Sequence, residues 1–240
     1  MGVAFLWGAL GASALLVGAL IAYLTPPSRN LLAFVMALGS GLLIGSVAFE
    51  LVDDAVTNKN VWQVGAMTLV GAAVFTAGDW YLDRRGGGDR KDSSGAQSSG
   101  AALAIVLGSV LDGIPESFVL GLTVRKGAIS VALLVGILLS NLPEGMSSSS
   151  GLKVAGWPLA RIVKMWLLVI IVSAAAAAIG YIVLSPSSGR TGAVVESFAA
   201  GALLSMVCST MLPEAFEVEG VFTGAFVVFG FAIALVLSAI

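Results

Sequence analysis

Two neighbouring apolar stretches decide the fold. The first, residues 101–124, reads AALAIVLGSVLDGIPESFVLGLTV, and the second, residues 127–152, reads GAISVALLVGILLSNLPEGMSSSSGL. Each is long enough to cross a bilayer as a helix, which takes about 20 mostly apolar residues. Each also contains a proline followed by a glutamate, and ionisable groups are rare inside a membrane span. The pair therefore predicts two adjacent transmembrane helices with acidic side chains in the apolar layer.

The composition of the whole chain agrees with a membrane protein. Of its 240 residues, 58% are hydrophobic and 11% are charged, whereas a soluble domain carries roughly 25% charged residues. The net charge is −2 and the twelve basic residues are scattered, so no nucleic acid partner is expected. The chain has no histidine, which excludes zinc peptidases of the His-Glu-x-x-His kind.

Hydropathy predicts an all-α membrane protein with eight transmembrane helices. The whole chain, residues 1–240, is expected to be a single polytopic transmembrane domain. The Gly- and Ser-rich residues 83–100 are expected to form a flexible cytoplasmic loop. The eight segments are Val3–Leu24, Leu31–Phe49, Val61–Gly78, Ala101–Val124, Gly127–Leu152, Met165–Leu184, Ser197–Leu212 and Gly220–Ile240.

The basic residues predict the orientation. With eight spans, one side of the membrane collects eight lysines and arginines and the other collects four. The richer side is expected to be cytoplasmic, which makes this a multi-pass protein of the cell membrane with both termini extracytoplasmic. The richer set is Arg29, Arg84, Arg85, Arg90, Lys91, Lys153, Arg161 and Lys164, and the poorer set is Lys59, Arg125, Lys126 and Arg190.

The sequence also contains segments that resemble one another. The second span can be aligned with the seventh so that Gly41 meets Gly201 and Asp54 meets Glu214. The fourth span can likewise be aligned with the fifth so that their Pro-Glu pairs coincide. Paired spans would cross the membrane in opposite directions, which predicts inverted repeats: spans 1–3 against spans 6–8, and span 4 against span 5. The alternative is chance, because membrane helices draw on few residue types.

The intramembrane acids are the candidate functional residues. Asp112 and Glu116 are four residues apart and therefore share a helix face. Glu144 has the equivalent place one helix later, with Ser140 four residues before it and Asn141 beside that serine. A charge at the bilayer centre costs about 2.5–3.5 kcal/mol on insertion scales. No lysine or arginine lies in either span, so these carboxylates need a cation or a proton.

The two prolines strengthen this interpretation. Pro115 and Pro143 have no N–H, so each helix is expected to kink and to free one backbone carbonyl inside the membrane. Freed carbonyls beside carboxylates attract cations, and irregular backbone is tolerated where it lines protein or water. The alternative is that the acids are protonated and hydrogen-bonded between helices.

At these positions the sequence resembles the ZIP family, the zinc- and iron-regulated permeases. That family has a His-Asn-x-Pro-Glu-Gly type signature on its fourth helix and a related one on its fifth. Here residues 112–117 read Asp-Gly-Ile-Pro-Glu-Ser and residues 140–145 read Ser-Asn-Leu-Pro-Glu-Gly. Residues 212–215, Leu-Pro-Glu-Ala, are similar to the family's ending of the seventh helix, and residues 50–55 fill the corresponding slot of the second.

The resemblance implies a metal site between the fourth and fifth helices. The family's first metal position maps onto Asp112, Glu116, Ser140 and Glu144, with aspartate where the family has histidine. Its second position maps onto Asn141 with the shared glutamates, but the glycine after Asp112 offers no side chain there, which favours one site. These ligands are all oxygen, which suits manganese, magnesium or calcium, while the resemblance implies zinc or ferrous iron.

Further acids are candidates for the transport path. Glu50, Asp53 and Asp54 end the second span on the expected outer side, where they predict an electronegative mouth that concentrates cations. Glu214 ends the seventh span on the inner side. An interfacial position in contact with solvent explains each of these acids equally well. Met206 is interpreted as a packing residue.

The sequence thus predicts a carrier of divalent metal ions, moved inward, with the ion as substrate rather than cofactor. Two alternatives stay open: the same acids relay protons for another solute, or the chain is a non-transporting scaffold. No enzymatic activity is expected, because no motif supports a pair of catalytic aspartates. The expected partners are a divalent metal ion and the lipid bilayer, with a homodimer as a further candidate.

Overall fold

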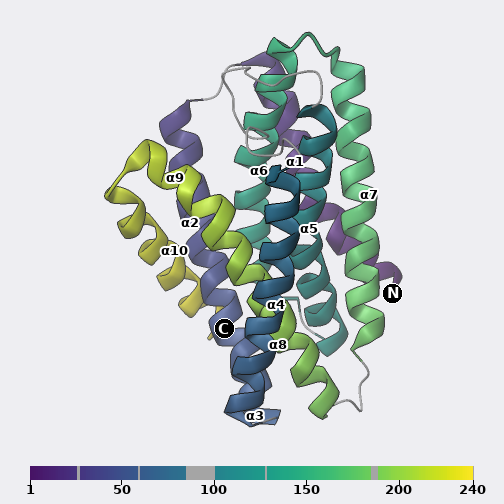
Figure 1. Cartoon of the computed structure of the whole chain (residues 1–240), viewed down its shortest axis with the longest axis vertical. Helices are drawn as coiled ribbons and strands as arrows, with labels where there is room; N and C mark the ends of the chain where they lie inside the picture. The colour runs from purple at the N-terminus through teal and green to yellow at the C-terminus, as the bar shows by residue number, and fades with distance from the viewer. Residues whose placement is uncertain (26–27, 59, 85–100, 128, 185–188, 240) are drawn as a thin grey trace.

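The computed structural model describes residues 1–25, 28–58, 60–84, 101–127, 129–184 and 189–239, and its elements there are helices (Figure 1). Most of the predicted loop at 83–100 lies outside the described residues. The elements are α1 (Gly2–Leu24), α2 (Arg29–Ser46), η1 (Val47–Val52), α3 (Asp53–Asn58), α4 (Val61–Leu82), α5 (Ala101–Lys126), α6 (Val131–Val154), α7 (Leu159–Val183), α8 (Gly189–Met206), η3 (Val207–Met211), α9 (Leu212–Glu219) and α10 (Phe222–Ser238).

Seven helical stretches in the described ranges are long and apolar enough to cross a membrane. Two of them, Arg29–Asn58 and Thr191–Glu219, are joined helices of 30 and 29 residues. An eighth apolar helix, α10, is shorter, with 17 residues. These lengths and compositions identify a helical, multi-pass membrane protein.

Several predicted boundaries are wrong because charged residues were taken as loop. The seventh span begins at Gly189 rather than Ser197, because Glu196 lies inside α8, and it continues to Glu219. The sixth begins at Leu159 rather than Met165, because Arg161 stays helical with its guanidinium over the Trp157 ring at 3.6 Å. Long basic side chains near a helix end reach polar surroundings without ending the helix.

The helices form two groups of four. One group contains α1, α5, α6 and α7, and the other contains α2, α4, α8 and α10. Figure 1 shows the first group on the right and the second on the left and in front. Glycines allow close packing within both groups. A Cβ added at Gly145 would lie 2.1 Å from the Leu15 carbonyl oxygen, and one at Gly201 would lie 1.8 Å from the Thr68 carbonyl oxygen. Small residues bring membrane helices this close because no side chain separates their backbones.

Both long stretches of the second group contain a π-helical segment. The segment η1 begins at Val47 in the stretch Arg29–Asn58, and η3 begins at Val207 in the stretch Thr191–Glu219. Val47 and Val207 also coincide when Gly41 is aligned with Gly201, so the two segments begin at equivalent positions of the sequence match. π-helical turns inside α-helices are rare and are frequent at functional sites. Here they interrupt the helices that face the first group.

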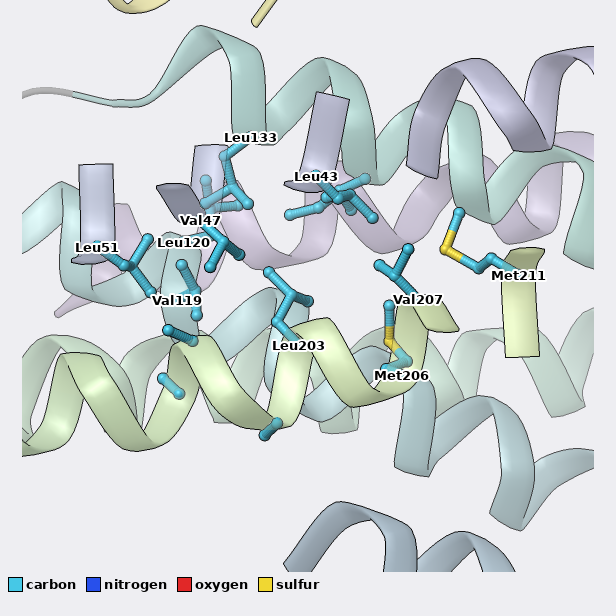
Figure 2. Close-up of a cluster of buried hydrophobic side chains, with 14 of the residues drawn as sticks. Leu43, Val47, Leu51, Val119, Leu120, Leu133, Leu203, Met206, Val207 and Met211 are labelled. Atoms are coloured by element: carbon cyan, nitrogen blue, oxygen red, sulfur yellow. The ribbon is translucent and has the colours of Figure 1, made fainter. Parts of the chain in front are cut away.

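The two groups meet across a layer of apolar side chains, which we call the apolar band. Figure 2 shows these side chains, with the sulfur atoms of Met206 and Met211 at one edge. Each band residue is at most 2% exposed. The band consists of Leu43, Val47, Leu51, Val119, Leu120, Leu133 and Leu203.

Candidate metal site

A cavity lies between the two groups of helices. Its volume is about 10 Å³, close to the minimum that one water molecule needs. That is room for about one water molecule or one small ion. The described residues that line it are Met36, Asp112, Glu116, Ser140, Glu144, Met206, Thr210 and Met211.

The first group of helices supplies the acidic wall. Asp112 and Glu116 come from α5, and Ser140 and Glu144 come from α6. The three carboxylate residues are 3–6% exposed, so they are buried in the protein and do not face lipid. Both prolines lie inside continuous helices beside these acids. The structure therefore brings together four of the five residues predicted to form the site.

Two serine hydroxyls orient the glutamates. Ser140 Oγ lies 3.0 Å from Glu116 Oε1 and 2.9 Å from the Ile137 carbonyl oxygen, so these two acceptors share its one proton, and the contact with Glu116 joins α6 to α5. Ser109 Oγ donates to Glu144 Oε1 at 2.6 Å, in the reverse direction between the same helices. Sequence reasoning missed Ser109, although it lies seven residues before Glu116 and therefore on the same face of α5. Each glutamate is thus held by a hydroxyl from the facing helix.

Asn141 does not line the cavity. Its side-chain nitrogen donates to the carbonyl oxygen of Gly11 at 3.1 Å, so the amide ties α6 to α1. Its neighbour Ser140 points to Glu116 instead, because successive residues of a helix point about 100° apart. The asparagine therefore has a structural contact of its own, with α1.

The second group of helices supplies the opposite wall. Met36 comes from α2, Met206 ends α8, and Thr210 and Met211 lie in η3. Thr210 Oγ1 donates to the carbonyl oxygen of Met206 at 2.7 Å. Sequence analysis did not find Met36, Thr210 or Met211, because no local pattern separates a methionine that lines a cavity from one that packs.

A separate ionic cluster lies at the lower end of the molecule in Figure 1, near α3. Lys126, the last residue of α5, forms ion pairs with Asp54 of α3 and, at 2.9 Å, with Glu196 of α8. Nearby, Ser130 Oγ donates to Glu50 Oε1 at 2.6 Å. Each contact joins one group of helices to the other. The expected electronegative mouth therefore contains a lysine that neutralises part of its charge.

The other two path candidates lie apart from the cavity. Asp53 is exposed at the start of α3, beside the ionic cluster. Glu214 is half-buried in the first turn of α9, three residues after Met211. Neither belongs to the residues that line the cavity.

The apolar band separates the cavity from the ionic cluster. On α5, the stretch from Asp112 to Lys126 spans about 21 Å along the helix axis, and Val119 and Leu120 of the band lie within it. Band residues also lie between Ser130 and Ser140 on α6 and between Glu196 and Met206 on α8. The cavity is therefore closed toward the end that carries Lys126.

The cavity is chemically suited to a cation. All eight described residues that line it carry an oxygen or sulfur atom in the side chain, and none of them is basic. In the described ranges, however, no three His, Cys, Asp or Glu side chains form a group arranged to hold a metal ion. Carboxylates alone therefore do not complete a coordination shell in this conformation. No protein-family model matches the chain, and no curated protein matches its sequence.

Proposed function

We propose that this protein carries divalent metal ions across a membrane, with the ion bound between α5 and α6. One observation carries the proposal. Three buried carboxylates from two proline-containing helices line one cavity with room for a single small ion, and no described lining residue is basic. Ionisable groups at membrane depth are costly, and where they occur they mark pathways for ions or protons.

The energetics favour a cation over a permanently charged empty site. Each carboxylate costs about 2.5–3.5 kcal/mol at the centre of a span, and three like charges in one cavity repel one another. A divalent ion offsets both terms at once, because the attraction between opposite charges is strong where water is excluded. A dicationic substrate can therefore serve as a counter-charge in this cavity.

The arrangement of the helices is what a carrier requires. The cavity is shared by two groups of four helices, so a movement of one group against the other changes the side from which it is reached. The π-helical segments, and the close-packed glycines Gly41 and Gly201, occupy equivalent positions in the second and seventh spans. These matches support the predicted inverted repeat of spans 1–3 in spans 6–8, and the proposed repeat of span 4 in span 5 depends on the sequence match of their Pro-Glu pairs.

The apolar band gives the proposal a direction. It closes the cavity toward the end that carries Lys126, which the distribution of basic residues predicts to be extracytoplasmic. The closed end would then face outward, and inward transport requires the ion to leave at the opposite, cytoplasmic end. The resemblance of residues 112–117 and 140–145 to ZIP-family signatures supports the same function and the same direction.

Metal flux into reconstituted vesicles tests the proposal. We expect Glu116→Gln and Glu144→Gln each to abolish the uptake of Mn²⁺, Zn²⁺, Fe²⁺, Co²⁺ and Cd²⁺ that the unaltered chain supports. Glutamine keeps the shape and the hydrogen bond from serine but removes the charge. Glu217→Gln, on the exposed face of α9, is the matched control and should leave uptake unchanged.

Two results would overturn the proposal. One is undiminished metal flux in both cavity variants. The other is a proton signal that follows an organic solute, ignores every metal in the panel and disappears with Glu144→Gln. That second result would assign the same carboxylates to a proton relay.

A further inference from the structure

A group of basic side chains, which we call the basic patch, lies at the end of the first group of helices away from Lys126. It consists of Lys153, the penultimate residue of α6, and of Arg161 and Lys164 in the first two turns of α7. Figure 1 shows α6 and α7 joined at the upper end of the molecule, opposite α3. All three side chains are exposed, and the end that carries them is the one predicted to be cytoplasmic.

Aromatic rings of one apolar cluster hold two of the patch residues. The Arg161 guanidinium lies 3.6 Å from the centroid of the Trp157 ring, and the Lys153 ammonium lies 4.9 Å from the centroid of the Tyr23 ring. Lys153 Nζ also donates to the Tyr23 carbonyl oxygen at 2.6 Å. Both rings pack against the same buried cluster. The two cations are therefore held in one region of the surface before any ligand binds.

The patch has no acidic counterpart in the described part of the first group. The acids there are Asp112, Glu116 and Glu144, and all three line the cavity. Glu144 is the nearest along the chain, about 13 Å along the helix axis from Lys153. No ion pair joins a patch residue to a described acid. The first turn of α7 also lacks an acidic residue, although the helix dipole favours negative charge there. The patch therefore attracts an anion from outside the protein.

An exposed apolar surface continues from the patch along α7. Leu168 and Ile171 lie on the same face of this helix as Lys164, four and seven residues after it, and both are exposed. Charged side chains are thus followed by apolar ones in the direction that leads into the membrane. This order matches an amphiphile with an anionic headgroup, whereas a soluble anion or an acidic protein segment would use the charged part alone.

We propose that the basic patch binds the headgroup of an anionic phospholipid whose acyl chains lie along Leu168 and Ile171. Basic pockets between transmembrane helices on the cytoplasmic side bind anionic headgroups, and the guanidinium of an arginine matches the geometry of a phosphate. The patch belongs to α6 and α7 alone. A bound lipid therefore holds the first group of helices, rather than the second, at the membrane surface.

Native mass spectrometry of the purified full chain tests the proposal. The probes are dioctanoyl phosphatidylglycerol, dioctanoyl phosphatidylcholine, which has the same chains but no net charge, and inorganic phosphate, which has no chains. We expect phosphatidylglycerol to be retained in preference to phosphatidylcholine, and an equal concentration of inorganic phosphate not to displace it. In the double variant Arg161→Gln, Lys164→Gln the affinity for phosphatidylglycerol should fall by about tenfold or more. The double variant Arg161→Lys, Lys164→Arg keeps both charges and should retain most of the binding.

Arg84→Gln is the matched control. The Arg84 guanidinium also lies over a tryptophan, 4.0 Å from the centroid of the Trp80 ring, but this residue follows α4 in the second group and is adjacent to Asp83. The control should leave the affinity for phosphatidylglycerol unchanged.

Three results would overturn the proposal: equal retention of the two lipids, an equal loss of affinity in Arg84→Gln and in the double glutamine variant, or displacement of phosphatidylglycerol by inorganic phosphate. The last result would assign the patch to a soluble anion. None of these measurements involves the cavity, so the proposed metal transport is tested separately.

Discussion

The ionic cluster around Lys126 allows a quantitative prediction. Its ammonium group bridges two carboxylates of unequal burial: the Glu196 side chain is 6% exposed and that of Asp54 is 51% exposed. Asp54→Asn removes the exposed partner, and exposed ion pairs contribute about 0.2–1 kcal/mol to stability. Lys126→Met instead leaves the buried Glu196 carboxylate without its cation. That costs about 3–5 kcal/mol in a fully buried pair, but Lys126 is 31% exposed, so we expect roughly 1–3 kcal/mol.

Thermal unfolding in detergent, followed by tryptophan fluorescence at one fixed scan rate, measures the difference. For a chain of this size 1 kcal/mol corresponds to about 2–4 °C in Tm. Lys126→Met should therefore lower Tm by several degrees and Asp54→Asn by much less. Adding Glu196→Gln to Lys126→Met should restore most of the loss, because no buried charge then remains. Lys164→Met, at an exposed position of α7, is the control.

The reasoning is refuted if Asp54→Asn costs as much as Lys126→Met, or if Glu196→Gln adds to the loss instead of relieving it. Either result would mean that the two groups of helices are not joined at this end by a buried charge pair. The closed conformation would then depend on the apolar band and on the hydrogen bond between Ser130 and Glu50.

Three further predictions follow from single contacts. Gly201→Ala should destabilise the protein by about 1–3 kcal/mol or more. Gly224→Ala is the control and should not destabilise it, because no atom lies within 4 Å of the added carbon. Equal Tm values for the two variants would contradict the close helix packing. Ser130→Ala removes both the cap of α6 and the hydrogen bond to Glu50 and should lower stability by about 0.5–2 kcal/mol; an unchanged Tm would refute the cap. Asn141→Ala should cost about 0.5–1.5 kcal/mol of stability and leave Cd²⁺ affinity unchanged in calorimetry; weaker binding would restore this residue as a ligand.

The sequence was most informative where the signal was local. Hydropathy located every membrane helix within the described residues, because a bilayer imposes length and polarity on each span separately. Hydropathy misplaced some helix ends, such as the one near Glu196. A charged residue can lie inside a helix there because a residue of another helix forms an ion pair with it. The partner, Lys126, belongs to α5 and is distant in the chain, and no pattern within either helix reports that contact.

The residues of the candidate site also differ in how far the sequence could predict their positions. The spacing of Asp112 and Glu116 predicted that they share a helix face, and the resemblance to the ZIP-family signatures implied that Ser140 and Glu144 join them; the structure places all four around one cavity. Asn141 was assigned to the site by resemblance, and the structure instead shows its amide bonded to α1. Ser109 lies on the same face of α5 as Glu116, so the same helical spacing points to it.

The sequence by itself determined that this chain spans a membrane with helices, and that carboxyl groups lie in the apolar layer of two of them. A local pattern was enough for this prediction, because the free energy of moving a side chain out of water depends mainly on the polarity of that side chain. Only the tertiary structure decided that thioethers and Thr210 face those carboxyl groups, and that the apolar band closes one end of the cavity. These features arise where the two groups of helices pack together, and the distances between side chains on different helices are not encoded in the periodicity of any one of them.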